Sequence, residues 1–346
     1  MTRPMYRKTC PIREFRTGQE VEDVFVLVQA RQAASRNGPY WDLRLQDATG
    51  QIEAKIWSPL SNEYTDLRAE QVVRIRAQVR TFREQQQLVL SELTHLQEGD
   101  FDWSELLPSS DPPPQELLQE LERLCRNELS NTGWKKLCRE VFGNKDTRSR
   151  LLAAPAAKAI HHAYRGGLLE HTLHVARTCL SICDLRPDLD REILLVGAVV
   201  HDLGKAWELH YGVAPEYTDT GRLLGHIVLG LQVLEPIMSR IQELDSELLL
   251  HLRHLILSHH GEFEYGSPKR PKTKEAFVLH FADNLDAKLN TVDAALEGRD
   301  EDDAWSAYQR SLERKVYRAS STSDFDKSDD TSSKSASRRC LLPLKE

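Results

Sequence analysis

The sequence predicts a multidomain protein, with an all-β barrel at the N-terminus, an all-α domain after it and a disordered C-terminal tail. Polar and apolar residues alternate with period two over residues 18–96. From about residue 117 to 318 the apolar residues recur with helical spacing, and the final stretch "SSTSDFDKSDDTSSKSASRR" is almost without them. Period two is typical of strands, and spacings of three and four residues are typical of helices.

The alternating region has the length and strand number of a small Greek-key barrel of the OB type. The segments "EVEDVFVLVQARQAA", "YWDLRLQDATGQIEAKIW" and "QVVRIRAQVRTFREQQQLVLSEL" hold about five strands in some 80 residues, with a turn at "DATG". An SH3-like barrel is the structural alternative. We assign residues 18–98 to the barrel and residues 1–17 to an N-terminal extension.

A change of composition marks the end of the barrel. The stretch "EGDFDWSELLPSSDPPPQE" is rich in proline, serine and acidic residues, so we expect a linker over residues 99–116. A helical connector is expected over 117–150 and the main helical domain over 151–318. Residues 319–346 contain too few apolar side chains to offset the entropy of ordering, so we expect a disordered tail.

Composition excludes several classes of function. The net charge of −7 gives no global signal for nucleic acid, so any such binding requires a local basic patch. No apolar run approaches the ~18 residues that span a bilayer. The six cysteines are scattered without a C-x-x-C pair, and the first residues include no hydrophobic segment. We therefore expect a cytoplasmic protein with reduced thiols and no membrane contact.

One apolar helix ends in two residues that are costly to bury. The run "ILLVGAVV" precedes His201 and Asp202, and its apolar residues cover every direction of a helix, as in a buried one. An unpaired buried carboxylate would cost several kcal/mol, so a cation, backbone donors or a metal must stabilise it. All of the 13 histidines except His95 lie within residues 161–280, which favours the metal.

Several helices are expected to bring an imidazole or a carboxylate inward. Such a set suits Mn²⁺, Fe²⁺, Co²⁺, Ni²⁺ or Zn²⁺ rather than Ca²⁺, and the lack of nearby thiolates argues against structural zinc. Asp202 has two oxygens and could bridge two ions, the common device for phosphoester hydrolysis. The predicted metal ligands are His171, His201, Asp202, His226, His259, His260 and Asp283.

The pattern of His171, the His201–Asp202 pair and Asp283 resembles the HD-domain metal-dependent phosphohydrolase superfamily. The stretches "HHAYRGGLLEHTLHVA", "VVHDLGKAWEL", "YTDTGRLLGHIVLG" and "LSHHGEFEYGSPKRPKTKEAFVLHFADNLDAK" resemble the YhaM-type 3′–5′ exoribonucleases, which join an OB-fold to an HD domain. The resemblance implies core ligands at the four positions above. It implies a second ion, with Mn²⁺ favoured, at the positions of the extension, which are His226, His259 and His260.

The resemblance also implies roles for His201, Asp202 and Lys205 in catalysis. Two ions would lower the pKa of a water molecule that attacks phosphorus in line with the leaving 3′ oxygen. Lys205 in "HDLGK" would hold a non-bridging phosphate oxygen, and a solvated lysine is the alternative. His161 and His162 are candidates for the general acid, and helix capping is an equal alternative for them.

Two segments are candidates for binding the strand. The loop "YGSPKRPKTKEA" is expected at the mouth of the site, although it could also be an ordinary solvated loop. In the barrel, aromatic residues and three arginines on one strand face are candidates, although Trp41 or Trp57 could instead fill the interior. The residues concerned are Tyr265, Lys269, Arg270 and Lys272 in the loop, and Tyr40, Trp41, Arg74, Arg76 and Arg80 in the barrel.

The leading hypothesis is a metal-dependent 3′–5′ exonuclease that acts on single-stranded RNA and possibly also on DNA. An HD phosphohydrolase acting on small nucleotides is the enzymatic alternative. A non-catalytic nucleic-acid-binding protein is the other alternative, and the complete set of ligands argues against it. The resemblance further implies that the chain forms a homo-oligomer.

Overall fold

The computed structural model describes most of the chain, which forms two compact units, Met1–Ala294 and Ala295–Glu346. The described residues are 5–36, 38–83, 85–97, 99–157, 164–210, 216–296 and 304–319. The predicted disordered tail, except for Ala319, lies outside them, and so do His161 and His162. The helical domain was expected to reach residue 318, but the last described helix ends at Leu296, and the second unit already begins at Ala295.

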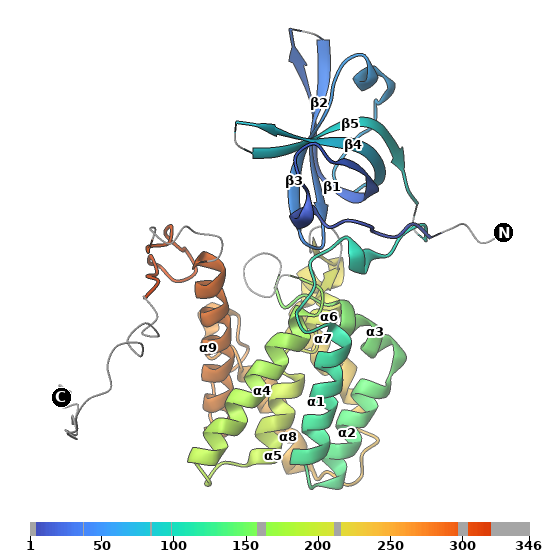
Figure 1. The fold of residues 1–346 in the computed structure, drawn as a ribbon. Coiled ribbons are helices and arrows are strands. Elements are labelled where there is room, and N and C mark those ends of the chain that lie inside the picture. The colour runs from blue at the N-terminus through green and yellow to red at the C-terminus, as the bar shows by residue number, and fades with distance from the viewer. Residues whose placement is uncertain are drawn as a thin grey trace, which may run out of the picture. The chain divides into compact units, whose positions relative to one another are not determined.

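The N-terminal region is a closed five-stranded barrel, as the period-two alternation predicts (Figure 1). Its strand order is β1-β2-β3-β5-β4, in which β3 and β5 pair in parallel and the other neighbours are antiparallel. The inward residues of each strand form one hydrophobic core. The strands are β1 (Glu20–Ser35), β2 (Gly38–Asp47), β3 (Gly50–Ile56), β4 (Val72–Phe82) and β5 (Gln85–His95).

The N-terminal extension is part of the barrel. Ile12 and Phe15 are buried in the barrel core, around a short 3₁₀ helix, η1 (Ile12–Glu14). Lys8 lies 3.6 Å from Asp23 and 3.2 Å from Asp47, and both carboxylates are buried. These ion pairs compensate the burial of three charges, so the extension is fixed to the strands rather than separate from them.

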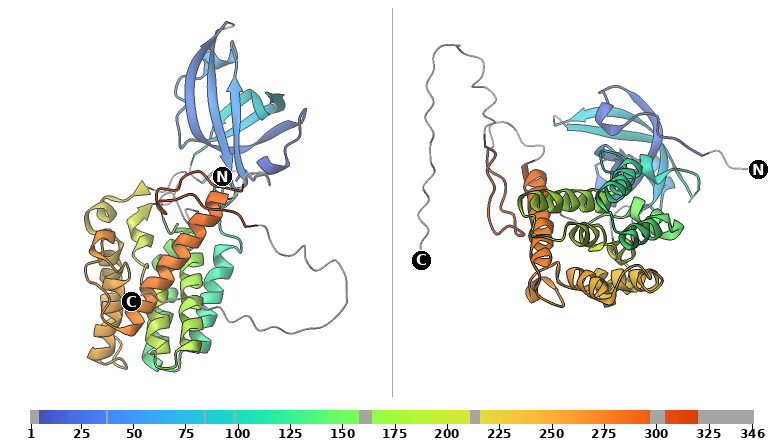
Figure 2. Two further views of the ribbon diagram at one scale, coloured as in Figure 1. Left: turned by 90° about the vertical axis from the view of Figure 1, so that its left-hand side faces the viewer. Right: turned by 90° about the horizontal axis from the view of Figure 1, so that it is seen from below.

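The rest of the first unit is a helical domain with one hydrophobic core. The helices predicted as a connector share this core with the later ones, so they form no separate element. Figure 2 shows that α9 is inclined to the other helices. The helices are α1 (Pro114–Glu128), α2 (Thr132–Gly143), α3 (Lys145–Ala153), α4 (Gly167–Leu185), α5 (Arg191–Val200), α6 (Lys205–Glu208), α7 (Asp219–Met238), α8 (Ser246–Ser258) and α9 (Lys274–Leu296).

Short elements connect the main ones. They are the 3₁₀ helices η2 (Leu60–Glu63), η3 (Trp103–Glu105) and η4 (Phe263–Tyr265), and the paired strands β6 (Leu209–His210) and β7 (Glu216–Tyr217). Across the described ranges of the chain, no helix combines the length and the apolar character that crossing a membrane requires.

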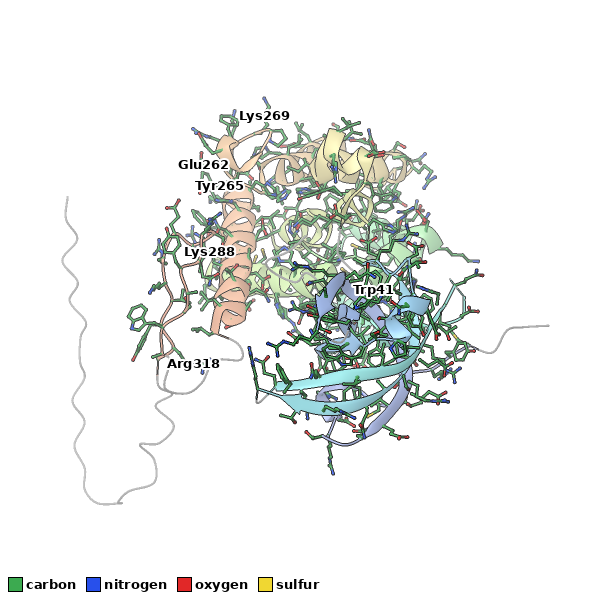
Figure 3. The ribbon with its side chains drawn as sticks, turned by 90° about the horizontal axis from the view of Figure 1, so that it is seen from above. Trp41, Glu262, Tyr265, Lys269, Lys288 and Arg318 are labelled. Carbon is green, nitrogen blue, oxygen red and sulfur yellow. The ribbon has the colours of Figure 1, made fainter. Side chains whose placement is uncertain are left out.

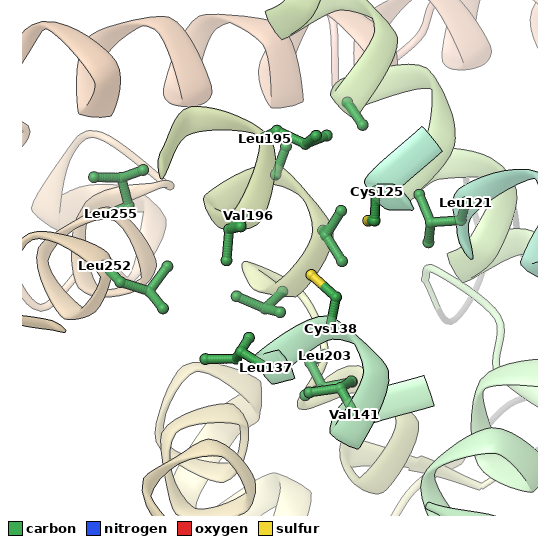
Figure 4. Packing of buried hydrophobic residues seen from close by; sticks show 14 of the residues in the cluster. Leu121, Cys125, Leu137, Cys138, Val141, Leu195, Val196, Leu203, Leu252 and Leu255 are labelled. Atoms are coloured by element: carbon green, nitrogen blue, oxygen red, sulfur yellow. The ribbon is translucent and has the colours of Figure 1, made fainter. Parts of the chain in front are cut away.

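Helix α5 is buried on all sides, as its composition predicts. Every residue from Ile193 to Val200 is buried, and Leu195 and Val196 lie among side chains of the surrounding helices in Figure 4. The side chain of Asp190 begins the helix by accepting hydrogen bonds from the backbone of Glu192 and Ile193. The helix therefore delivers the residues that follow Val200 into the interior.

A close backbone contact joins the turn after α5 to α7. A β-carbon on Gly204 would lie 1.9 Å from the carbonyl oxygen of His226 and 2.5 Å from the amide nitrogen of Gly230. Gly225 has a φ of +74° and interrupts α7, so His226 begins a new helical segment instead of lying one turn inside a continuous helix. Glycine is needed at position 225 for its positive φ and at position 204 for the close approach of the two backbones.

We expect Gly204→Ala to lower the free energy of unfolding by about 3 kcal/mol, because the added methyl group meets backbone atoms that cannot rotate away. Gly143→Ala is the matched control, since a β-carbon there meets nothing within 4 Å. That change should stabilise the protein slightly. Urea unfolding followed by circular dichroism measures both variants. Equal midpoints for the two would contradict the close contact.

Candidate metal centre

Two clusters of metal-ligating side chains meet at one carboxylate. The potential ligand atoms of His171, His201, Asp202 and Asp283 lie within 4.8 Å of one another, and so do those of Asp202, His226, His259 and His260. The structure therefore brings together all seven predicted ligands. Asp202 is the member that both clusters share.

Each oxygen of the Asp202 carboxylate faces a different cluster. Oδ2 lies 3.4 Å from Nε2 of His171 and 3.4 Å from Nε2 of His201. Oδ1 lies 3.4 Å from Nε2 of His226 and 3.5 Å from Nε2 of His259. On the first side, His171 Nε2 is also 3.2 Å from Asp283 Oδ1. Each oxygen of Asp202 therefore lies among the potential ligand atoms of one cluster.

Several of these atoms are buried without a hydrogen bond. Within the described residues, Nε2 of His201, His226 and His259 and Oδ1 of Asp202 make none. A buried polar atom left unsatisfied costs about 1–3 kcal/mol. Four such atoms pointing at one another fit divalent cations, which would accept the lone pairs of all of them.

The other ring nitrogen of each histidine is fixed by an acceptor. Nδ1 of His201 lies 2.8 Å from the carbonyl oxygen of Ala198. Nδ1 of His259 lies 2.7 Å from the carbonyl oxygen of Ile256. Nδ1 of His260 lies 2.8 Å from the carbonyl oxygen of Tyr265. A carbonyl only accepts, so Nδ1 of each ring carries the proton and donates it. Nε2 is then the unprotonated nitrogen that a metal requires.

Carboxylates fix the remaining two histidines, one in each cluster. Nδ1 of His171 lies 2.7 Å from Asp286 Oδ2, and Nδ1 of His226 lies 3.3 Å from Glu208 Oε1. Glu208 also accepts the backbone N–H of His226, at 3.0 Å. A carboxylate behind a metal-binding imidazole sets its tautomer and raises its basicity.

Sequence reasoning gave these two carboxylates too little weight. From the sequence, Asp286 is expected at most to support the neighbouring Asp283, and Glu208 carries no expectation. Glu208 is 8% exposed, and the sequence places it at the end of the same "HDLGKAWE" stretch. A buried acidic residue close to a predicted ligand was a usable signal, but its partner His226 is 18 positions away in sequence.

The charges of the site suit cation binding. Burial alone would raise the pKa of Asp202, but Lys205 and His201 hold that pKa well below its ordinary value. Burial and the neighbouring His259 lower the pKa of His260 to about 4. Burial likewise lowers the pKa of His259. The carboxylate is therefore charged and these imidazoles are neutral at neutral pH, the forms in which both bind a metal.

Lys205 is half-buried beside the shared carboxylate. Its ammonium nitrogen lies 2.7 Å from Asp202 Oδ2, and its side chain is 15% exposed. Burial alone would lower the pKa of Lys205, but Asp202 and Asp283 raise it above its ordinary value. The structure thus differs from the alternative of a solvated lysine and places a permanent cation at the site.

The predicted loop of the strand-binding residues starts next to a metal ligand. The carbonyl of Tyr265 is the acceptor of His260 Nδ1, and the Tyr265 side chain is 65% exposed. Figure 3 shows Tyr265 and Lys269 on the outside of the helical domain. Arg270 pairs with Glu262 at 2.8 Å, and the backbone of Lys272 donates to His254.

The barrel residues are placed less uniformly than predicted. Trp41, labelled in Figure 3, is 7% exposed and belongs to the barrel core, where its indole N–H donates to the Tyr64 carbonyl. The prediction that Trp41 contacts a strand is therefore wrong, because the interior covers the face of the ring. Tyr40 instead packs against Trp57, with ring centroids 4.8 Å apart, and Trp57 is 40% exposed.

The three predicted arginines of β4 point outward, but two of them pair with acidic residues. Arg74 and Arg76 both bind the carboxylate of Glu22, and Arg76 also lies 3.5 Å from Glu92. Arg80 donates to the neutral Gln78. Strand parity predicts the shared face correctly, but it could not predict the neutralising partners across the strands.

Comparisons with known protein families divide the chain in the same way. The HD domain family matches residues 168–288, which include every predicted metal ligand. The OB-fold nucleic acid binding domain family matches residues 24–96, and a family described as a putative helicase matches residues 110–188. The order of barrel and helical domain thus agrees with the families.

Relatives that match most of the chain decide the family. A 3′–5′ exoribonuclease YhaM from Bacillus velezensis is 36% identical over 282 residues, covering 81% of this chain and 88% of the relative. The chain belongs to the YhaM family of 3′–5′ exoribonucleases. The YhaM protein of Bacillus subtilis has the same identity and coverage. That of Shouchella clausii is 36% identical over 289 residues, covering 83% of this chain and 89% of the relative.

We expect Asp286→Asn and Glu208→Gln each to weaken Mn²⁺ binding by about 10–100-fold, because each removes the charged acceptor behind one histidine ligand. Asp293→Asn, an exposed change on the same helix as Asp286, is the control. Isothermal titration calorimetry on the purified chain gives the affinities. If all three variants bind Mn²⁺ equally, these carboxylates do not position the ligands.

Proposed function

We propose that this chain is a divalent-metal-dependent 3′–5′ exonuclease that degrades single-stranded RNA. The observation that carries the proposal is the carboxylate of Asp202, whose two oxygens face two separate groups of metal ligands. Two adjacent ions are a common means of hydrolysing phosphodiesters. The activity named for the relatives supplies the substrate and the direction of degradation.

Each cluster would hold one ion, with Mn²⁺ favoured and Co²⁺, Fe²⁺, Ni²⁺ or Zn²⁺ also suited to imidazole and carboxylate ligands. Bound ions supply the activation of a water molecule for attack on phosphorus and the neutralisation of charge on the phosphoryl oxygens. His171, His201 and Asp283 would hold one ion, and His226, His259 and His260 would hold the other. Asp202 belongs to both.

Lys205 would contribute a fixed positive charge. Its ammonium group lies beside the shared carboxylate, where it would hold a phosphoryl oxygen and neutralise the charge that develops there. Burial restricts the motion of this side chain, so little reorganisation is needed when the substrate binds. His201 and Asp202, the other two predicted catalytic residues, would act by holding the ions.

The strand would be held by exposed aromatic and basic side chains. Tyr265 would stack on a base next to His260, and Lys269, Arg270 and Lys272 would contact phosphates. On the barrel, Tyr40 with its neighbour Trp57 offers an aromatic surface, and Arg80, which donates to the neutral Gln78, offers a cation. Arg74 and Arg76 would bind a phosphate only if it displaced the carboxylate of Glu22 from them. None of these contacts excludes single-stranded DNA.

A cytoplasmic location and a homo-oligomeric state complete the proposal. The described cysteines are free thiols, as in a reducing compartment. Helix α9 exposes a large apolar side chain at every fourth position, and these side chains form one stripe on the face opposite Asp283. An antiparallel second copy would match this stripe with itself. The stripe consists of Phe277, Phe281, Leu285 and Leu289, which are 50%, 63%, 49% and 54% exposed.

We expect the double variant His201→Ala, Asp202→Ala to lose Mn²⁺-dependent shortening of a 3′-tailed RNA by about 10³-fold or more. The ligands it removes would provide several kcal/mol of transition-state stabilisation. A 5′-labelled RNA resolved on a gel shows stepwise loss from the 3′ end. His210→Ala, which removes an exposed histidine outside both clusters, should leave the rate unchanged.

Two other results would contradict this function. Hydrolysis of small nucleotides without shortening of RNA would show a phosphohydrolase of another specificity. RNA binding without any metal-dependent hydrolysis would show a binding protein. A single-stranded DNA of the same sequence, measured in parallel, gives the preference between the two polymers.

We expect Phe281→Glu combined with Leu285→Glu to convert the oligomer to smaller species, because four charges would be buried in the paired stripes of two copies. Arg139→Glu is the control, since it places a new carboxylate at an exposed position on another helix, α2. Size-exclusion chromatography with light scattering gives the masses. An unchanged mass for the double variant would exclude this surface as the interface.

A further inference from the structure

The second unit contains a short hairpin, residues 304–319. Its two arms are joined by backbone hydrogen bonds from Ser306 to Val316 (2.8 Å), from Gln309 to Arg314 (2.9 Å) and from Arg318 to Ala304 (2.7 Å). The tip turns at Glu313, which has a φ of +55°. These bonds fix the register of the arms, so side chains on the two arms have defined neighbours.

The hairpin exposes three aromatic rings. Trp305 and Tyr317 are bridge partners, so their side chains lie on one face, with ring centroids 5.0 Å apart. They are 54% and 52% exposed, and Tyr308 is 58% exposed. A Trp or Tyr side chain buries 150–250 Å² when it packs fully. Rings left half-exposed on a short, ordered hairpin indicate a binding surface rather than a core.

Cations accompany these rings. The hairpin contains Arg310, Arg314, Lys315 and Arg318 and only one acidic residue, Glu313, so its net charge is 4 − 1 = +3 in a chain of net charge −7. Arg310, Arg314 and Lys315 are exposed. Arg318 is half-buried and donates to the Leu296 carbonyl, so we leave it out of the binding surface.

We propose that the hairpin 304–319 is an additional binding site for single-stranded RNA, separate from the metal centre. The faces of Trp305, Tyr308 and Tyr317 would stack on bases, and Arg310, Arg314 and Lys315 would contact phosphates. Stacking rings among cations are the usual means of holding a single strand without reading its sequence. A protein partner would favour a continuous apolar patch, whereas Leu312 and Val316 of the hairpin are half-buried. The choice of RNA rests on the proposed function.

The test measures RNA binding by the full chain. In an Asp202→Ala background, which prevents cleavage, fluorescence anisotropy with a 20-nucleotide oligouridylate gives Kd between 50 and 200 mM salt. We expect Trp305→Ala with Tyr317→Ala to raise Kd about tenfold or more, because each lost stacking contact weakens binding by at least severalfold. The conservative pair Trp305→Phe with Tyr317→Phe should restore most of the affinity.

Charge reversal gives a second, independent measurement. Arg310→Glu, Arg314→Glu and Lys315→Glu together should weaken binding and reduce the slope of log K against log salt by about two, since each contact on a single strand contributes about 0.7. The matched control reverses three exposed arginines of α1 and α2 and makes the same change in net charge. These are Arg123, Arg126 and Arg139.

Three results would overturn the proposal. The first is that both sets of hairpin variants leave Kd unchanged. The second is that the control triple variant weakens RNA binding as much as the hairpin triple variant does. The third is that the hairpin variants change the mass of the oligomer without changing the affinity for RNA. The last would indicate a second protein chain as the partner. Hydrolysis of bis(p-nitrophenyl) phosphate by the hairpin variants, with Asp202 intact, reports on the metal centre alone and should be unchanged. Failure of that hydrolysis in the unmodified chain would refute the proposed function without affecting the RNA-binding result.

Discussion

A carboxylate emerging from a fully apolar helix is the constraint on which the rest of the helical domain depends. Asp202 follows α5, whose residues are buried on every side, and is itself 2% exposed. Such a charge is stable only where other groups compensate the loss of water. Lys205 supplies one positive charge, and histidines from surrounding helices supply nitrogens that point at both carboxylate oxygens. The buried position and the metal-binding function have the same physical origin.

The backbone around this carboxylate is as constrained as the side chains. Gly204 allows the turn after α5 to touch α7, and Gly225 interrupts α7 where His226 must enter the second cluster. Glu208 then holds both the backbone and the ring of that histidine. The seven residues 202–208 therefore provide a shared ligand, a cation, a close backbone contact and a positioning carboxylate. A substitution at any of these four positions would disturb the geometry of the others.

The strand-binding surfaces are governed by weaker and more local interactions. Period two correctly predicts that Arg74, Arg76 and Arg80 share a face, because alternation is a property of every strand. It cannot predict that Glu22 of a neighbouring strand neutralises two of them, or that Trp41 fills the barrel while Tyr40 stays at the surface. The aromatic and basic hairpin after α9 was likewise hidden, because its residues look like a helical continuation until the hydrogen bonds of its two arms are known.

The sequence by itself determined the order of the two folds, the burial of α5 and the seven candidate ligands. These properties follow from local periodicity and from the chemistry of residues that are costly to bury. Only the tertiary structure decided which oxygen of Asp202 faces which histidines, and that Asp286 and Glu208 orient one histidine in each cluster. It also decided that α1, α2 and α3 belong to the helical core. Such contacts join residues up to 115 positions apart, and no local pattern encodes their distances.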